Sequence, residues 1–193
     1  MPQADWIPRL GREQMDAALG TYLAPRVARL GYLGEWFRCA GNAPQVLLRF
    51  MEFTEALKEA VAANISEVVV LTVASVLDNA YERNQHERLA LRTGFSRAWI
   101  AEVERLSPDA ALCLSEAERA AQRYAIAALG GDAAATQRHF AALAEHFSPS
   151  EGIAIVMLVG RYWTHALGVR TLELAAPVPS VFEDGFTVGE TTP

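Results

Sequence analysis

The sequence contains little cysteine and few strand-forming patterns. Only two of its 193 residues are cysteines, Cys39 and Cys113, and they lie far apart along the chain. Two isolated cysteines form neither a disulfide framework nor a CxxC or zinc-binding pattern. We therefore expect a reducing, cytoplasmic location, with both thiols inert in the core.

An excess of basic charge is also missing. The chain has 17 Lys and Arg residues against 23 Asp and Glu residues, which gives a net charge of −6. No basic stripe interleaved with aromatic residues occurs, so nucleic acid is not an expected partner. The first residues lack the charged and apolar regions of a signal peptide, and the longest apolar run is too short to span a bilayer. We expect no membrane partner.

The composition favours one all-α fold. Strand signals are scarce, and the chain is 51% apolar and 21% charged, which suits a globular core. We expect an N-terminal arm with short helices (residues 1–30), a helical domain (31–176) and an extended tail (177–193). Apolar residues in the tail suggest packing on a neighbour or on the chain's own body: Val181, Phe182 and Phe186.

Proline and glycine set the expected helix boundaries. Short helices are predicted over residues 12–19 and 32–40, with the chain broken around Pro25. Asn42 is expected to cap the next helix, which has Pro44 in its first turn. Later helices are expected over residues 115–129, 134–146 and 149–168. The buried stripe of the helix after Pro44 is predicted to contain Leu47, Phe50, Thr54, Leu57 and Val61.

A polar residue followed three positions later by Glu marks several helix starts. This capping-box pattern occurs at residues 64–67, 115–118 and 148–151, and 79–82 is a fourth candidate. Ser96 can start a further short helix.

The boxes at 64–67 and 148–151 belong to a weak internal repeat. Each opens a markedly apolar helix and follows an amphipathic helix with aromatic residues. The second copy has Trp163 in place of Asn79 and Arg170 in place of His86. We therefore expect any chemistry in the first copy, with the second copy supplying packing and assembly surface.

The densest group of ionisable side chains follows the most apolar run, between Glu67 and His86. If the segment after this run is helical, Asn79, Glu82 and His86 lie on one face, at positions i, i+3 and i+7. A carboxylate and an imidazole one turn apart, beside an apolar helix, could form an acid/base pair whose pKa values burial would adjust.

The same stretch resembles the carboxymuconolactone decarboxylase and alkylhydroperoxidase D (AhpD)-like family. The resemblance rests on a Glu that opens a long apolar helix, here Glu67, and on a Y-E-x-x-x-H signature, here Tyr81 to His86. The L-S-E-A-E-R and H-F-S-P-S-E-G segments downstream are also similar. The resemblance implies an AhpD-like helical fold with two related halves, assembled as a homo-oligomer, a trimer or a hexamer.

The peroxidase branch of that family has a CxxC pair followed by a His. By that spacing the cysteine positions fall on Asn79 and Glu82, while Glu67 and His86 match the Glu and the His. A disulfide-exchanging peroxidase needs an attacking thiolate and a resolving thiol, which Asn and Glu cannot supply. The resemblance therefore favours the decarboxylase side. Its catalytic residues would be Glu67, Glu82 and His86, with Asn79 and Tyr81 binding the substrate.

Structural interpretations exist for the same residues. Glu67 and Glu82 could serve only in capping boxes, and His86 could be a hydrogen-bonded structural histidine. A metal site made by these three residues lacks a closing ligand, so we expect neither a metal nor a cofactor. Among the other histidines we expect solvent exposure for His139 and His146, and an interface or pocket wall for His165.

Three functional hypotheses follow. The first is a cofactor-free acid/base enzyme, lyase-like, acting on a small carboxylate or lactone in a pocket near a subunit boundary. The second is an AhpD-like antioxidant protein using thiols, which would be favoured by Cys39 and Cys113 within disulfide reach or by peroxide turnover lost in Cys→Ala variants. The third is a non-catalytic member that binds a small ligand, and its properties would be insensitive to substitution of Glu82 and His86.

Overall fold

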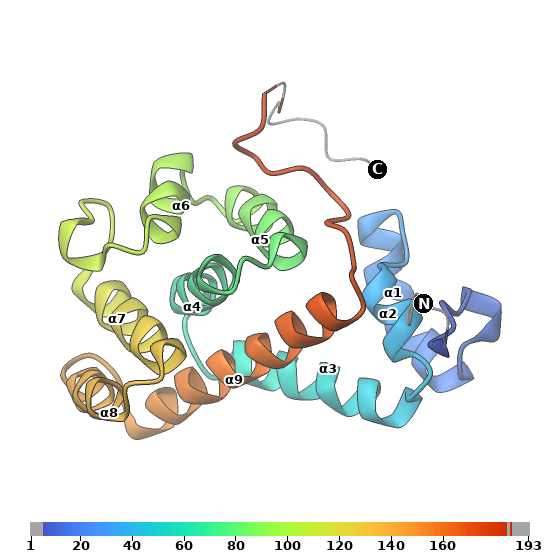
Figure 1. Cartoon of the computed structure of the whole chain (residues 1–193), viewed down its shortest axis with the longest axis horizontal. Helices are drawn as coiled ribbons and strands as arrows, with labels where there is room; N and C mark the ends of the chain where they lie inside the picture. Colours follow the sequence, from blue (N-terminus) through green and yellow to red (C-terminus); the bar gives the residue numbers. More distant parts are fainter. Residues whose placement is uncertain (1–5, 185, 187–193) are drawn as a thin grey trace.

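A computed structural model describes residues 6–184 and 186, and all regular structure within them is helical (Figure 1). This confirms the predicted all-α class. Short 3-10 turns occur at η2 (Arg12–Gln14), η3 (Pro108–Ala110) and η4 (Leu143–Glu145). The α-helices are α1 (Ala17–Leu30), α2 (Glu35–Ala40), α3 (Pro44–Glu59), α4 (Ala63–Val76), α5 (Ala80–Arg92), α6 (Arg97–Glu104), α7 (Glu116–Gly130), α8 (Ala133–Ala142) and α9 (Pro149–Thr171).

Helix α4 is the centre of the fold. Its residues are buried without interruption from Ile65 to Ala74. Helices α5, α7 and α9 pack around it (Figure 1). Valine is a mediocre helix former, but burying each apolar side chain contributes about 1.5–3 kcal/mol. Tertiary packing therefore stabilises this helix, and α4 becomes a fixed wall against which site residues can be positioned.

Helix α1 differs from the prediction, because it continues through Pro25 without a break. The predicted helix over residues 12–19 is only the short turn η2 followed by the start of α1. Asp16 caps α1 by accepting from two backbone N–H groups, and Gly31 ends it in the left-handed conformation. Two α1 leucines also pack into a cluster with α3. Caps at both ends and this packing outweigh the hydrogen bond lost at Pro25.

The predicted serine caps are confirmed. Ser115 and Ser148 form reciprocal capping boxes with Glu118 and Glu151, and Ser96 caps α6 by accepting from a backbone N–H. These caps depend on residues within one turn of each other, so the sequence pattern is sufficient to find them.

Two predicted asparagine caps are wrong. Asn42 donates to the backbone carbonyls of Pro8 and Cys39, and Asn64 donates to Glu118 Oε1 at 3.1 Å. Helices α3 and α4 begin after alanine residues that supply no side-chain cap. Both asparagine amides thus make tertiary contacts, and Glu67 does not form the predicted capping box with Asn64.

An amphipathic helix followed by an apolar helix occurs twice, as α3–α4 and as α8–α9. The two copies differ in continuity. The first copy breaks between α4 and α5, whereas α9 runs for 23 residues without interruption. Trp163, at the position that corresponds to Asn79, is half exposed on α9.

The C-terminal tail packs along the chain's own body, against α5. Asn84 donates to the carbonyl of Val178 at 2.8 Å. The carboxylate of Glu87 accepts from the Ser180 hydroxyl and from the Val181 N–H, both at 2.7 Å, and Val181 is fully buried. The last residues of the predicted tail lie outside the described residues.

Glu87 also forms a carboxyl pair with Glu104 of α6. Burial, together with the negative charge of Glu87, raises the pKa of Glu104 to about 8. One oxygen of each carboxyl has no hydrogen-bond partner among the described residues. A proton shared between the two groups would satisfy both, so this pair is most stable when it has a single negative charge.

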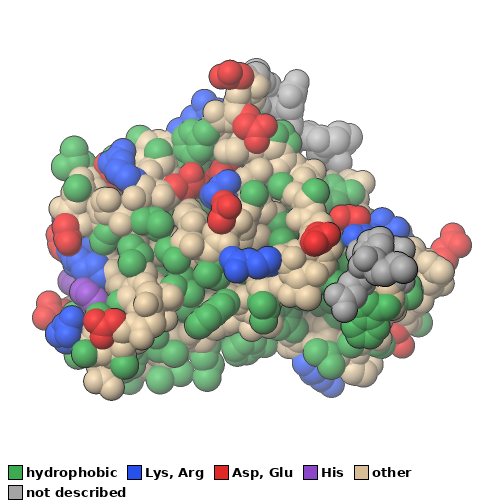
Figure 2. Space-filling view, viewed as in Figure 1, with side chains coloured by type: hydrophobic (Ala, Val, Ile, Leu, Met, Phe, Trp, Pro, Cys, Tyr) green, Lys and Arg blue, Asp and Glu red, His purple; other side chains and the backbone are tan. Residues whose placement is uncertain are grey.

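Among the described residues, α9 is the one helix long and apolar enough to cross a membrane by length and composition. Of its most apolar window, 56% is buried inside the fold, as expected for a core helix. Figure 2 shows hydrophobic side chains gathered over the lower part of the molecule, where α3 and α9 lie. The exposed apolar residues of α9 are Ile153, Met157, Trp163 and Leu167.

Candidate functional site

The site begins at the turn between α4 and α5. Asp78 takes the left-handed backbone conformation, with φ of 49°, and Asn79 caps α5 by accepting from the Glu82 N–H at 3.4 Å. A non-glycine residue in this conformation is uncommon and costs about 1–3 kcal/mol. The turn redirects the chain so that α5 packs back against α4, which brings side chains of the two helices together.

Three of the predicted site residues meet there. His86 Nδ1 lies 2.7 Å from Glu67 Oε2, and His86 Nε2 lies 3.5 Å from Glu82 Oε2. All three side chains are buried. Only the contact to Glu67 is a hydrogen bond, so the geometry assigns the ring proton to Nδ1. Nε2 is then the nitrogen available to accept a proton.

Helix α9 adds two ionisable side chains: Arg161, which was not predicted, and His165, which was expected at an interface or pocket wall. Arg161 Nη1 and His165 Nε2 each lie 3.3 Å from Glu82 Oε1, and Arg161 Nε donates to Thr54 Oγ1 at 2.8 Å. Both are almost completely buried, at 5% and 2% exposure. The expectation that the second copy supplies only packing and assembly surface is therefore wrong, whereas His165 is confirmed as a pocket wall.

The cluster fixes the charge of Glu82. Burial by itself would raise its pKa, but at the low pH where Glu82 titrates, the positive charges of His165, His86, Arg161 and Lys58 outweigh burial and lower the pKa of Glu82 to about 2. Burial lowers the pKa of His165 to about 4. His165 is thus neutral at pH 7, and Arg161 is the permanent counter-charge. Glu82 is an ionised carboxylate at neutral pH and cannot donate a proton.

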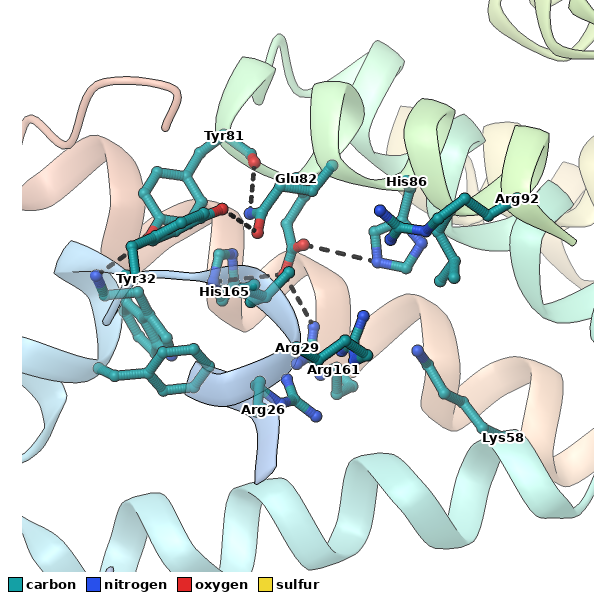
Figure 3. A pocket seen from close by; sticks show the side chains of 16 residues that line it. Arg26, Arg29, Tyr32, Lys58, Tyr81, Glu82, His86, Arg92, Arg161 and His165 are labelled. Carbon is teal, nitrogen blue, oxygen red and sulfur yellow. Dashed lines mark hydrogen bonds and ion pairs between the residues drawn. The ribbon is translucent and has the colours of Figure 1, made fainter. Parts of the chain in front are cut away.

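A cavity of about 100 Å³ opens beside this cluster (Figure 3). It is smaller than the cavity of about 150 Å³ that accommodates benzene, so it suits a small molecule. Glu82, His86 and His165 form part of its wall. Five basic side chains from four helices also line it: Arg26 and Arg29 of α1, Lys58 of α3, Arg92 of α5 and Arg161 of α9.

The basic side chains give the cavity a positive charge that the sequence did not predict. The sequence between residues 67 and 86 contains one arginine, Arg83, but the fold brings arginines from distant helices to this cavity. Glu82 is the one acidic residue among the lining side chains, so the cavity has excess positive charge although the chain is acidic overall. Within residues 6–184 and 186, no group of three His, Cys, Asp or Glu side chains is arranged as a metal site.

The two predicted substrate-binding residues are placed differently. Tyr81 lines the cavity, and its hydroxyl accepts from the backbone N–H of Trp36 at 3.2 Å. Burial raises the pKa of Tyr81, so the hydroxyl stays protonated and can donate. Asn79 is not among the lining residues. It lies at the α5 cap and lines a second cavity of about 330 Å³, whose wall Tyr81 shares.

The two cysteines lie away from this site. Cys39 is buried in α2, and burial raises the pKa of its thiol. Cys113 is exposed in the connection before α7, so the expectation of a core thiol is wrong for this residue. Figure 1 places α2 and the start of α7 on opposite sides of the molecule. Neither residue lines the cavity.

Comparison with known proteins identifies structures with a similar fold. No family model matches the chain, and no curated protein does. A cysteine-to-alanine variant of the debrominase Bmp8, in complex with 2,3,4-tribromopyrrole, superposes with a TM-score of 0.74 at 17% identity, over 88% of this chain and 90% of that one. An AhpD core protein of Ralstonia eutropha JMP134, described as peroxidase-related, gives 0.74 at 14%, over 88% and 90%.

A third structure is a putative antioxidant defence protein AhpD from Agrobacterium tumefaciens, with a TM-score of 0.66 at 19% identity. It covers 72% of this chain and 96% of that one. The chain has the AhpD-like fold. This confirms the predicted architecture and the resemblance at the level of fold. The likeness does not extend to activity, because one fold hosts many chemistries.

Proposed function

We propose that this AhpD-like chain is a cofactor-free acid/base enzyme, lyase-like, that acts on a small carboxylate or lactone acid. One observation supports this most directly. His86 bonds a buried carboxylate, Glu67, through Nδ1 and borders the cationic cavity. A carboxylate on one ring nitrogen holds the imidazole in one tautomer and orientation, as in established acid/base histidines. Glu67 and His86 thus have the geometry of a proton-transfer pair.

The positive lining supports an anionic substrate. A guanidinium can bind a carboxylate through two parallel hydrogen bonds. Arg161 is already occupied by Glu82 and Thr54, and Arg26 pairs with Glu55 at 2.8 Å. Two further lining arginines are exposed and available, so we assign them to the substrate carboxylate: Arg29 of α1 and Arg92 of α5.

In the proposed reaction, loss of CO₂ leaves an electron pair on the carbon next to a carbonyl group. His86 delivers a proton to that carbon, and Glu67 stabilises the imidazolium before the transfer. Tyr81 donates a hydrogen bond to the carbonyl oxygen as negative charge develops there. Glu82 remains ionised throughout and stabilises the protonated form of His86 from the Nε2 side.

The test follows proton exchange and CO₂ release with acetoacetate and with a carboxylated butenolide in D₂O, by ¹H NMR. We expect exchange at the carbon next to the carbonyl, reduced on the order of 10²-fold or more in His86→Gln. Glu67→Gln should reduce it less. The matched control is His146→Gln, which alters an exposed imidazole. Equal rates in the wild type and His86→Gln, or no exchange with either probe, contradict the proposal.

Two other functions make different predictions. A thiol-based antioxidant is compatible with the fold, but Cys39 and Cys113 give it no support. Peroxide turnover that disappears in Cys39→Ala or Cys113→Ala would favour it. A non-catalytic binding protein would bind the same acids without exchange, and His86→Gln would leave that binding unchanged.

We also propose that the protein is cytoplasmic and self-assembles, as a trimer or a hexamer, through the exposed apolar side chains of α9. Contiguous apolar surface of this kind is typical of interaction sites. Met157 and Leu167 are 47% and 60% exposed. Met157→Glu should lower the mass measured by light scattering, whereas Arg138→Glu on exposed α8 should not. An unchanged mass in Met157→Glu would exclude this face.

A further inference from the structure

Lysine occurs once in the chain. Sixteen of the 17 basic residues are arginine, and the remaining one is Lys58. It lies near the end of α3, and its side chain lines the cationic cavity (Figure 3). Arginine stays protonated in proteins, whereas a lysine amine can lose its proton. The cavity therefore contains the chain's one side-chain amine, among four guanidinium groups.

This amine is not used in the protein's own contacts. Across residues 6–184 and 186, the Lys58 side chain makes no hydrogen bond or ion pair, in contrast to Arg161 and Arg26 in the same cavity. Figure 3 shows it extending from α3 toward the side of the cavity with His86 and Arg161. The side chain is half-buried and lines the cavity, so a ligand in the cavity can reach its amine.

We propose that Lys58 is the nucleophile of this site, and that it forms a Schiff base with the ketone or aldehyde carbonyl of a small oxo acid. The inference rests on the proposed function and narrows its substrate class to carboxylates that also have a carbonyl group. Lys58 would approach the carbonyl from α3. Arg29 and Arg92 would hold the carboxylate from α1 and α5.

Burial makes the Lys58 amine easier to deprotonate than an exposed lysine. Burial lowers the pKa of Lys58, and the positive charge of Arg161 acts in the same direction, while Glu67, Glu82 and Glu55 oppose it. A lysine that is desolvated beside another cation is a known route to a nucleophilic amine near neutral pH.

The chemistry needs no oxidant or reductant. The Lys58 nitrogen adds to the carbonyl carbon, and the carbonyl oxygen takes up two protons and leaves as water, which gives a protonated imine. In a 3-oxo acid the bond to the carboxylate then breaks, CO₂ leaves, and its electron pair moves to the imine nitrogen. His86 protonates the carbon of the resulting enamine. Water finally hydrolyses the imine, which releases the ketone and restores the amine.

The experiment traps the imine in the full chain. The protein is incubated with acetoacetate or pyruvate and sodium cyanoborohydride, and its intact mass and peptide map are measured. We expect one adduct, on the peptide that contains Lys58. Its added mass is that of the probe minus one oxygen atom, and also minus CO₂ if decarboxylation has occurred. Lys58→Arg keeps the positive charge and should lose the adduct. Acetone, which lacks the carboxylate, should label much more slowly.

A surface lysine is the matched control. Arg138→Lys in the Lys58→Arg background restores one amine on the exposed face of α8, and it should remain unlabelled. Equal labelling there, or no adduct on Lys58 with either probe, would overturn the proposal. The two proposals fail separately. If Lys58→Arg retains the exchange that His86→Gln abolishes, Lys58 is only an anion-binding group and the acid/base function stands.

Discussion

Replacing Glu82 by glutamine should destabilise the protein strongly, and more at neutral pH than in acid. Glu82 is 8% exposed and contacts Arg161, His165 and His86. The substitution keeps the shape of the side chain but removes its negative charge. Arg161 would then be buried without an anion, which is the costly way to break a buried ion pair.

The size of this destabilisation follows from the lowered pKa of Glu82. The cluster lowers the pKa of Glu82 from 4.5 to about 2, and a difference of this size corresponds to about 3 kcal/mol of stability at pH 7. Removal of one partner from a buried ion pair costs about 3–5 kcal/mol, which agrees. Because His165 is neutral at pH 7, we expect the lower end, about 3 kcal/mol.

The sign of the pH dependence is fixed by the direction of the shift. A lowered carboxyl pKa gives stability that is complete above the unfolded-state pKa and is lost as the pH falls toward 2. The difference between the wild type and Glu82→Gln should therefore shrink between about pH 5 and pH 2.

Urea unfolding, monitored by circular dichroism at several pH values, measures both the loss of stability and its pH dependence. Glu59→Gln, an exposed carboxylate on α3, is the control and should change stability by less than about 0.5 kcal/mol. A double-mutant cycle with Arg161→Gln should give a coupling energy of about 1–3 kcal/mol. A Glu82→Gln protein as stable as the control, or a loss that does not vary with pH, would refute the assigned charge cluster.

Three further predictions concern stability. Gly168→Ala should cost about 1–3 kcal/mol, because its Cβ would overlap a ring carbon of Trp36. Gly160→Ala, on the same helix, has free space around its Cβ and should gain about 0.5–1 kcal/mol; urea unfolding of both variants tests the difference. The lowered pKa of His165 means that stability falls as the pH drops from about 6.5 to 4, by up to about 3 kcal/mol, and His165→Asn should flatten this part of the pH profile. The raised pKa of Glu104 means that stability falls as the pH rises. Glu104→Gln should therefore stabilise the protein by about 1–2 kcal/mol at pH 9, after allowance for solvent screening, and change little at pH 5. Thermal unfolding at the two pH values tests this.

The parts of the fold that sequence predicts well are local. The serine caps depend on side chains within one turn, and α4 is identified by an uninterrupted apolar run. The meeting of Glu67 and His86 was also predictable, because the resemblance supplied one position on each of two consecutive helices. Their catalytic role stays a prediction.

Long-range contacts account for what sequence reasoning missed. Asn64 has the spacing of a cap, but its amide reaches Glu118, 54 positions later in the chain. Pro25 should break a helix by its own preference, yet packing on α3 and two good caps hold α1 together. Arg29 and Arg92 show no mutual pattern in the sequence, because only the tertiary fold brings α1 and the end of α5 to one cavity.

The carboxylate at position 82 explains why α9 belongs to the site. A buried carboxylate needs a counter-charge to stay ionised. Arg161 supplies it from α9, and His165, one turn later on the same side of this unbroken helix, contacts the same carboxylate oxygen.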